Sequence, residues 1–266
     1  MPLQPPFQPH SDGPLLRPLA QRPQAALRLY CFPPAGTGPA IYLPWADLLP
    51  PAIELFALHL PGRGSHPTHV STTDPRRLIH EITDLITAEN PASFAFFGHS
   101  VGALLAFETA RQLWRTHAML PSLLALSSFP PPHHEAMQNK IVTAVLDGLH
   151  DSGGLVPLMP DSATAEAHRK AAYYAPIVAD SLLVLQHRHH EEAPLDAPLA
   201  LYAGDTDPLA PLPTLTAWND LFTQPATPHL YPGKHLYLFD QSPAITQQLG
   251  KDLDAVMNGA SPHPTD

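Results

Sequence analysis

The stretch Phe97-Gly98-His99-Ser100-Val101-Gly102 is a G-x-S-x-G turn between a strand-like run and a helix-like run. Residues 93–97 are short, aromatic and apolar, as in a buried parallel strand, and residues 103–116 have the length and composition of a helix. The chain must reverse tightly at Ser100, and the two glycines remove side chains that would collide there. This pattern favours a nucleophile elbow with Ser100 as the catalytic nucleophile. The alternative is a glycine-rich turn with an incidental serine.

A serine hydroxyl is a poor nucleophile at neutral pH, so Ser100 needs a base and an acid that orients the base. The base should be His235, because it lies one short loop after the last expected strand, residues 227–231. An expected strand at 199–203 comes before it and leads into a loop that carries two carboxylates. The resulting order of serine, acid and histidine is that of the α/β hydrolases.

The acid is Asp207 or Asp205. We favour Asp207, because it precedes Pro208, where the chain leaves the end of the strand. Asp205 is then interpreted as a turn residue that bonds to its own backbone. In the active arrangement the acid fixes the imidazole tautomer and stabilises the imidazolium that forms.

An oxyanion must also be stabilised by donors. One donor should be the backbone N–H of Val101, which follows the nucleophile at the start of a helix. The second should come from the loop 33–38, which follows an expected strand at 27–32 and contains glycines that allow close approach of the backbone. We assign this role to the Ala35 N–H; the alternative is an ordinary Pro/Gly loop.

Five blocks spread over about residues 27–255 occur together in one enzyme family. They are Cys31-Phe32-Pro33-Pro34-Ala35-Gly36, Pro44-Trp45-Ala46, Leu60-Pro61-Gly62-Arg63-Gly64, Phe97-Gly98-His99-Ser100-Val101-Gly102-Ala103-Leu104-Leu105-Ala106-Phe107-Glu108 and Tyr231-Pro232-Gly233-Lys234-His235. With these blocks the chain resembles the stand-alone (type II) thioesterases of polyketide and nonribosomal peptide assembly lines. Together the blocks are far more specific than the serine motif.

The resemblance implies an α/β-hydrolase fold, with a mostly parallel central sheet flanked by helices and a helical lid insertion. It places the catalytic residues at Ser100, Asp207 and His235 and the oxyanion donors at the amides of Ala35 and Val101. It also implies acyl or peptidyl carrier proteins as partners and no cofactor, since the partner carries the phosphopantetheine arm. The chain departs from the family pattern at Thr37, Val101 and Lys234. None of these departures removes a reacting group, so they bear on substrate fit.

Length and composition agree with one catalytic domain, expected at residues 25–258. The single cysteine, Cys31, excludes an internal disulfide and lies inside an expected strand. No targeting segment and no apolar run long enough to span a bilayer occur, so we expect a cytoplasmic protein that does not bind membranes. Residues 1–24 hold seven of the 35 prolines and are predicted to form a flexible arm outside the fold. Residues 259–266 are predicted to be a flexible tail.

From about residue 130 to 198 the alternation of strand and helix stops. Helical stretches interrupted at Gly148 and Pro176, among other positions, predict a lid over the strand ends. Apolar residues of this segment are candidates for an acyl channel, the alternative being the lid's own small core. The candidates are Leu155, Met159, Tyr173, Tyr174 and Ile177, followed by Leu182 and Leu185.

The net charge of −10 argues against nucleic-acid binding and leaves few cations for an acidic carrier protein. Those available are Arg63, Arg76, Arg77, Arg111 and Arg115, whose alternative role is surface solubility. We expect a monomer.

A metal site is a further possibility at residues 187–192, which crowd imidazoles and carboxylates together. Adjacent residues face different ways, so we expect a solvated end of a lid helix there, and the same for His133 and His134. Metal ligands are therefore not predicted.

The sequence thus predicts a thioesterase that removes acyl groups from carrier proteins. Two alternatives stay open. A fatty acyl or acyl-CoA thioesterase or a carboxylesterase would use the same residues, and a non-catalytic carrier-binding chaperone would keep the fold without turnover.

Overall fold

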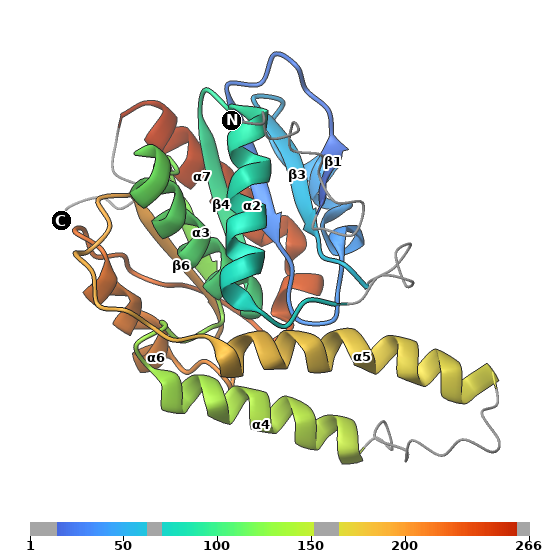
Figure 1. The fold of residues 1–266 in the computed structure, drawn as a ribbon. Helices are drawn as coiled ribbons and strands as arrows, with labels where there is room; N and C mark the ends of the chain where they lie inside the picture. The colour runs from blue at the N-terminus through green and yellow to red at the C-terminus, as the bar shows by residue number, and fades with distance from the viewer. Residues whose placement is uncertain (1–14, 63–70, 152–164, 260–266) are drawn as a thin grey trace, which may run out of the picture.

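The computed structural model describes residues 15–62, 71–151 and 165–259, which form a seven-stranded sheet with helices on both faces (Figure 1). The strands are β1 (Leu15–Ala20), β2 (Leu27–Phe32), β3 (Ile53–His59), β4 (Phe94–His99), β5 (Leu124–Ser127), β6 (Leu199–Gly204) and β7 (His229–Tyr231). The α-helices are α1 (Trp45–Leu48), α2 (Pro75–Glu89), α3 (Val101–His117), α4 (Glu135–Asp151), α5 (Ala165–Gln186), α6 (Leu212–Thr216) and α7 (Ser242–Met257). Short 3₁₀ helices occupy Pro39–Tyr42, Ala217–Leu221 and Tyr237–Phe239.

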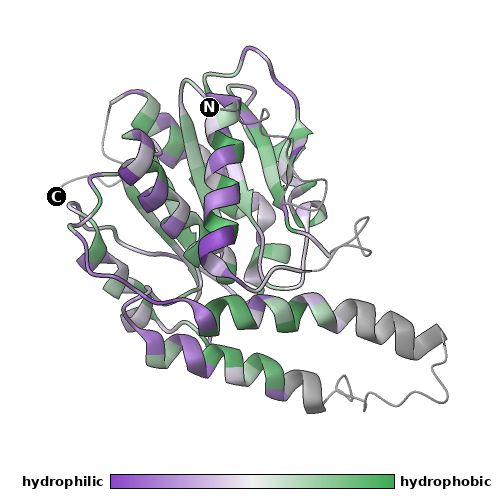
Figure 2. Ribbon diagram, in the orientation of Figure 1, coloured by the Kyte–Doolittle hydropathy of each residue, from purple (hydrophilic) through white to green (hydrophobic). Residues whose placement is uncertain are grey.

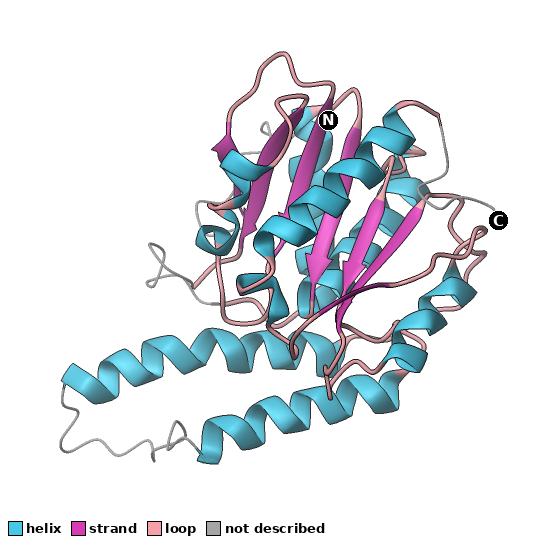
Figure 3. Cartoon of the chain, turned by 180° about the vertical axis from the view of Figure 1, so that it is seen from behind, coloured by secondary structure: helices cyan, strands magenta, loops and turns pink. Residues whose placement is uncertain are grey.

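The sheet has the strand order β1-β3-β2-β4-β5-β6-β7. β1 runs antiparallel to β3, and all the other neighbouring pairs are parallel. This confirms the mostly parallel α/β sheet predicted from the sequence. The parallel strands end at one edge, and Figure 3 shows their arrowheads pointing towards the two long helices α4 and α5. The loops that follow β2, β4, β6 and β7 therefore meet at that edge.

The central strand β4 sends alternate side chains into two cores. Phe94 and Phe96 enter the cluster beneath α2 and α3, whereas Ala95 and Phe97 enter the cluster beneath α1 and α7. Burial of both faces explains why β4 is a continuous apolar run instead of an alternating one. Figure 2 shows the contrast between the hydrophobic strands and the hydrophilic outer side of α2.

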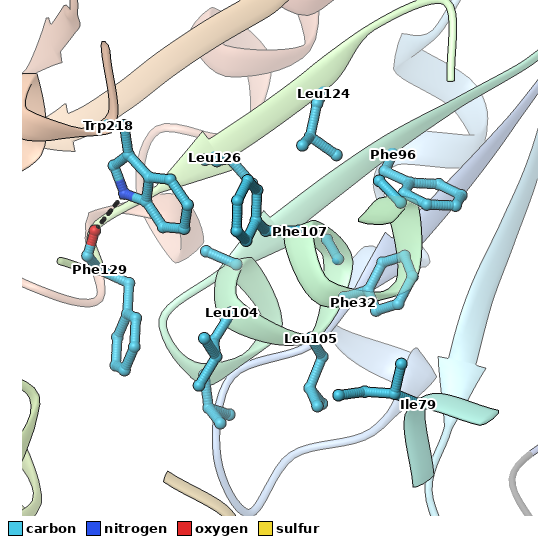
Figure 4. Close-up of a cluster of buried hydrophobic side chains, with 14 of the residues drawn as sticks. Phe32, Ile79, Phe96, Leu104, Leu105, Phe107, Leu124, Leu126, Phe129 and Trp218 are labelled. Carbon is cyan, nitrogen blue, oxygen red and sulfur yellow. Dashed lines mark hydrogen bonds between the residues drawn. The ribbon is translucent and has the colours of Figure 1, made fainter. Parts of the chain in front are cut away.

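The first of these cores extends beneath α3 to the far end of the sheet. Figure 4 shows it around Phe107 and Leu104, with the indole of Trp218 donating a hydrogen bond of 2.7 Å to the carbonyl oxygen of Phe129. This bond satisfies a buried polar group that would otherwise be costly. Residues of α3 from Val101 to Leu113 belong to this core, so the helix that follows the serine turn is packed along its inner side.

The N-terminal segment differs from the prediction. Residues 15–20 are not part of a separate arm but form β1, where Leu16 lies opposite Leu58 of β3. Pro18 is compatible with this role because β1 is an edge strand with an irregular register between Pro18 and Ala20. The prediction of an arm over 1–24 was therefore wrong from residue 15 onward. Residues 1–14 and all but the first residue of the predicted tail lie outside the described residues.

Between β5 and β6 the described residues form the helices α4 and α5, which are longer than the predicted helical stretches. Gly148 lies within α4 and Pro176 lies within α5, so neither residue breaks its helix. A proline forfeits one helical hydrogen bond. Burial of the following turns of α5 at Ala179, Leu183 and Val184 offsets that loss. Within the described residues, no helix is both long and apolar enough to cross a membrane.

Candidate active site

Ser100 occupies the tight turn between β4 and α3, with a φ of 56° and a ψ of −128°. Both flanking glycines are sterically required. A Cβ atom on Gly98 would lie 2.3 Å from the carbonyl oxygen of Gly102, and a Cβ on Gly102 would lie 2.1 Å from that of Phe32. The strained turn is the local geometry expected of a nucleophile elbow.

His235 lies between Ser100 and Asp207. Its Nε2 atom is 2.9 Å from the Ser100 Oγ, and its Nδ1 atom is 3.0 Å from an Asp207 Oδ2. The three side chains come from the ends of β4 and β6 and from the loop after β7, so the parallel sheet brings them together. Donation of Nδ1–H to Asp207 leaves Nε2 free to accept the serine proton.

The Asp207 side chain is fully buried. Burial by itself would raise its pKa, but hydrogen bonds from His235 and from the Leu209 amide hold the pKa below its ordinary value. Asp207 therefore carries a negative charge beside the imidazole at neutral pH. That charge is suited to stabilising an imidazolium.

Asp205 lies two residues away in a different environment. It is exposed, and its Oδ1 atom accepts a hydrogen bond of 3.0 Å from the Gly233 amide. This contact fixes the loop that carries His235 but does not reach its ring. Of the two candidate acids, the structure places Asp207 beside His235.

A buried polar network supports His235 from below, and the sequence analysis missed it. His99 Nδ1 is 2.8 Å from the Ser127 Oγ, which is 2.7 Å from the Tyr237 hydroxyl. The His99 ring lies 5.4 Å from the His235 ring, centroid to centroid. Burial lowers the pKa of His99 to about 3, so this ring is neutral under ordinary conditions. The signal in the sequence was His99 itself, a polar residue at the buried end of an apolar strand.

The loop after β2 lies against the start of α3, since a Cβ on Gly102 would also lie 2.8 Å from the Pro33 carbonyl oxygen. Within the described part of the chain, no group accepts a hydrogen bond from the amides of Ala35 or Val101. By contrast, the Gly36 amide donates to the Asp180 Oδ2 at 2.8 Å. The predicted oxyanion donors are thus two amides at the same edge of the sheet that have no acceptor among the described residues.

The channel candidates have different outcomes. Tyr174 and Ile177 are half-buried on α5, whereas Leu182 and Leu185 are exposed on its outer side. Their exposure shows that these two leucines are not part of a buried lid core, and their role in a channel stays a prediction. Leu155 and Met159 lie outside the described residues, and of Tyr173 the structure describes only its place in α5.

Arg111 is not on the surface. Its side chain is 1% exposed, and its guanidinium donates to the His190 carbonyl at 3.1 Å and lies 4.7 Å from the centre of the Phe107 ring. The prediction that Arg111 helps to attract a carrier protein was therefore wrong. Arg115 is half-exposed but paired with Glu192 at 2.6 Å. Arg63 lies outside the described residues.

The histidine-rich segment after α5 is only partly solvated. His187 is buried and lies 3.0 Å from a Glu108 carboxylate oxygen, whereas Arg188 and His190 are exposed. The expectation of a solvated end was wrong for His187, because it packs against α3. Among the residues that the structure describes, no group of three or more histidine, cysteine or carboxylate side chains is arranged to hold a metal ion.

Comparisons with known proteins agree with this geometry. The model of the family "Thioesterase domain" matches residues 27–253. The thioesterase PikA5 of Streptomyces venezuelae is 28% identical over 87% of this chain and 82% of its own length. The medium-chain S-acyl fatty acid synthase thioesterase of Homo sapiens is 29% identical over 84% of each chain.

Solved structures are similar over the same region. The type II thioesterase BorB from the borrelidin biosynthetic cluster aligns with a TM-score of 0.73 and 25% identity, covering 90% of this chain and 96% of its own. The family match covers most of the chain, including all three residues of the hydrogen-bonded set. The chain therefore belongs to the thioesterase domain family and is a serine hydrolase.

Proposed function

We propose that the protein hydrolyses acyl groups from the phosphopantetheine arms of acyl or peptidyl carrier proteins in a polyketide or nonribosomal peptide pathway. The observation that carries this proposal is the hydrogen-bonded set of Ser100, His235 and Asp207 in a chain of the thioesterase family. The names of similar proteins support the pathway, since BorB is a type II thioesterase from a biosynthetic cluster. The match covers 82% of the length of PikA5 and 96% of the length of BorB.

In the first half-reaction the Ser100 Oγ attacks the thioester carbonyl carbon while His235 Nε2 takes the hydroxyl proton. The tetrahedral intermediate then collapses, the carbon–sulfur bond breaks, and His235 gives its proton to the leaving thiolate. This leaves an acyl group on Ser100 and a free thiol on the carrier. Asp207 stabilises the imidazolium throughout.

In the second half-reaction a water molecule attacks the acyl-enzyme ester. His235 removes the proton from the water and returns it to the Ser100 Oγ as the ester bond breaks, which frees the carboxylic acid product. In both steps negative charge develops on the former carbonyl oxygen. In our proposal the amides of Ala35 and Val101 stabilise this charge. Val101 begins α3 directly after Ser100, the loop that contains Ala35 follows β2 at the same edge, and neither amide has an acceptor among the described residues.

The helices α4 and α5 act as the lid over this site in our proposal, with Tyr174 and Ile177 beside the acyl chain. Support comes from α5, whose Asp180 side chain reaches the loop that contains Ala35. Carrier docking then falls to exposed cations, of which Arg76 is the best remaining candidate. A monomeric enzyme without a cofactor, acting in the cytoplasm, completes the proposal.

A second candidate is a fatty acyl or acyl-CoA thioesterase, favoured by the similarity to the human medium-chain enzyme. The two functions are separated by measuring kcat/KM for the same acyl group on a carrier protein, on coenzyme A and on an N-acetylcysteamine thioester. Our proposal predicts the highest value for the carrier-bound substrate. A higher value for acyl-CoA than for the acyl carrier would contradict it and favour the second candidate.

A further inference from the structure

The loop that follows β2 is tied to α5 by a hydrogen bond between residues far apart in the sequence. The Gly36 amide donates to the Asp180 Oδ2 at 2.8 Å, across 144 residues. Asp180 is 1% exposed and lies in the C-terminal half of α5. The bond therefore joins the insertion to the part of the site that contains the Ala35 amide.

The burial of the Asp180 carboxyl group has to be explained. Its neighbours on the inner side of α5, including Ala179, Leu183 and Val184, are buried and apolar. A charged group buried among such residues is costly unless strong hydrogen bonds compensate. The Gly36 amide at 2.8 Å supplies one such bond, so the loop contributes to holding this carboxylate in place.

Ile177, one turn earlier on α5, contacts the same glycine. A Cβ atom on Gly36 would lie 2.1 Å from the Ile177 Cγ1, and Gly36 has a φ of +72° that favours glycine. The loop also has an internal bond, from the Thr37 hydroxyl to the Pro34 carbonyl at 2.8 Å. The loop is thus a compact unit that meets α5 at two adjacent points.

We propose that Asp180 is a positioning residue that fixes the loop so that the Ala35 amide points at the oxyanion. By accepting from the Gly36 N–H, Asp180 sets the plane of the peptide that joins Ala35 to Gly36. That constraint orients Ala35 itself, and it exists only while α5 is seated on the loop. Hydrolysis is thereby coupled to the position of the insertion. The inference rests on the proposed function, because it requires the Ala35 amide to stabilise the transition state.

The test compares Asp180→Ala, Asp180→Asn and the matched control Ser181→Ala on an acyl-N-acetylcysteamine thioester. Ser181 lies on the same turn, but its hydroxyl bonds to the Ile177 carbonyl of its own helix. Loss of a positioned oxyanion donor should lower kcat by about 10- to 100-fold in Asp180→Ala, with little change in KM. Asp180→Asn keeps an acceptor oxygen and should retain most of kcat, as should Ser181→Ala.

Unchanged kcat in Asp180→Ala would overturn the inference. So would a change confined to KM, or an Asp180→Asn enzyme as impaired as Asp180→Ala, since neither result fits a side chain that acts by accepting the Gly36 hydrogen bond. The comparison of kcat is valid if Asp180→Ala shows a normal thermal unfolding transition. If Asp180→Ala fails to fold, Asp180→Asn is compared with the wild-type protein instead.

Hydrogen exchange separates this inference from the proposed function. In a Ser100→Ala background, where turnover is absent, adding Asp180→Ala should accelerate exchange of the Gly36 amide by at least about tenfold. Unchanged exchange would refute the hydrogen bond, whatever the kinetics show. Normal hydrolysis by the Ser100→Ala protein would instead refute the proposed function.

Discussion

The imidazole of His235 has a neighbour on each of three sides. Ser100 and Asp207 bind its two nitrogen atoms, and the neutral ring of His99 lies beneath it. The first two contacts determine which nitrogen can take a proton. The third is an uncharged ring 5.4 Å away, centroid to centroid.

Replacing Asp207 by asparagine tests the role of the acid. Asparagine keeps the size of the side chain but removes the charge and favours the wrong imidazole tautomer, so kcat should fall by about 10³- to 10⁴-fold. Asp205→Asn is the matched control. It weakens only the bond to the Gly233 amide and should cost far less. Steady-state kinetics of both variants test the assignment. A larger loss of kcat in Asp205→Asn than in Asp207→Asn would contradict it.

The effect of Asp207→Asn on the free energy of unfolding should depend on pH. Because the pKa of Asp207 is lowered in the folded protein, its carboxylate contributes stability that is fully present above its ordinary pKa near 4. This contribution disappears as the pH falls through the lowered pKa. The difference in unfolding free energy between wild type and Asp207→Asn should therefore be constant near neutrality and shrink in acid. Urea titrations that show a difference growing in acid would contradict this.

The roles of residues that lie in a recognisable sequence motif could be predicted from the sequence. The roles of residues that depend on contacts with distant parts of the chain could not. The motif around Ser100 and the order of strands and loops led to His235 and Asp207. Nothing near Asp180 indicates Gly36, because the two meet only after the chain has folded. Arg111 was misjudged because a cation is normally exposed, whereas here the Phe107 ring and the His190 carbonyl surround it.

At the level of elements, the contact between α3 and β2 positions the serine. Gly102 lets the first turn of α3 lie directly on the end of β2, whose Phe32 carbonyl would lie 2.1 Å from a Cβ. A backbone atom cannot move away as a side chain can. The distance between the nucleophile and the oxyanion loop therefore depends on one missing methyl group.

Gly102→Ala should destabilise the protein by about 3 kcal/mol or more, since the overlap is with backbone. Gly250→Ala is the matched control in α7, where the nearest atom to a new Cβ is a Pro50 carbon at 3.5 Å. That substitution should stabilise by up to about 1 kcal/mol through helix propensity. Chemical denaturation of both variants measures the effects. Equally small changes in the free energy of unfolding in the two variants would contradict the packing described for Gly102.

The elements themselves were predicted with uneven success. β2 begins and ends where the apolar run at 27–32 placed it. β4 begins one residue and ends two residues later than the predicted 93–97, and β6 ends one residue later than the predicted 199–203. β1 was missed because prolines argue against regular structure, yet an edge strand tolerates Pro18. α5 continues through Pro176 because tertiary burial outweighs one missing hydrogen bond.

For the whole molecule, the order of strands explains how four distant segments form one site. In the described sheet β4 lies between β2 and β5, and β6 and β7 follow, so the loops carrying Ala35, Ser100, Asp207 and His235 open at the same edge. Chain order predicted this convergence. The seating of α5 on that edge depends on packing between segments more than a hundred residues apart, which sequence patterns do not encode.

The central claim is that Ser100 is acylated and deacylated in each turnover. The most direct measurement compares thioester hydrolysis and fluorophosphonate labelling by the wild-type protein and Ser100→Ala, with intact-mass detection of the label. We expect wild type to take up the phosphonyl group on the peptide that contains Ser100. Ser100→Ala should fold normally, take up no label and lose about 10⁴- to 10⁶-fold in kcat. A Ser100→Ala protein that hydrolyses the thioester at close to the wild-type rate would contradict the claim.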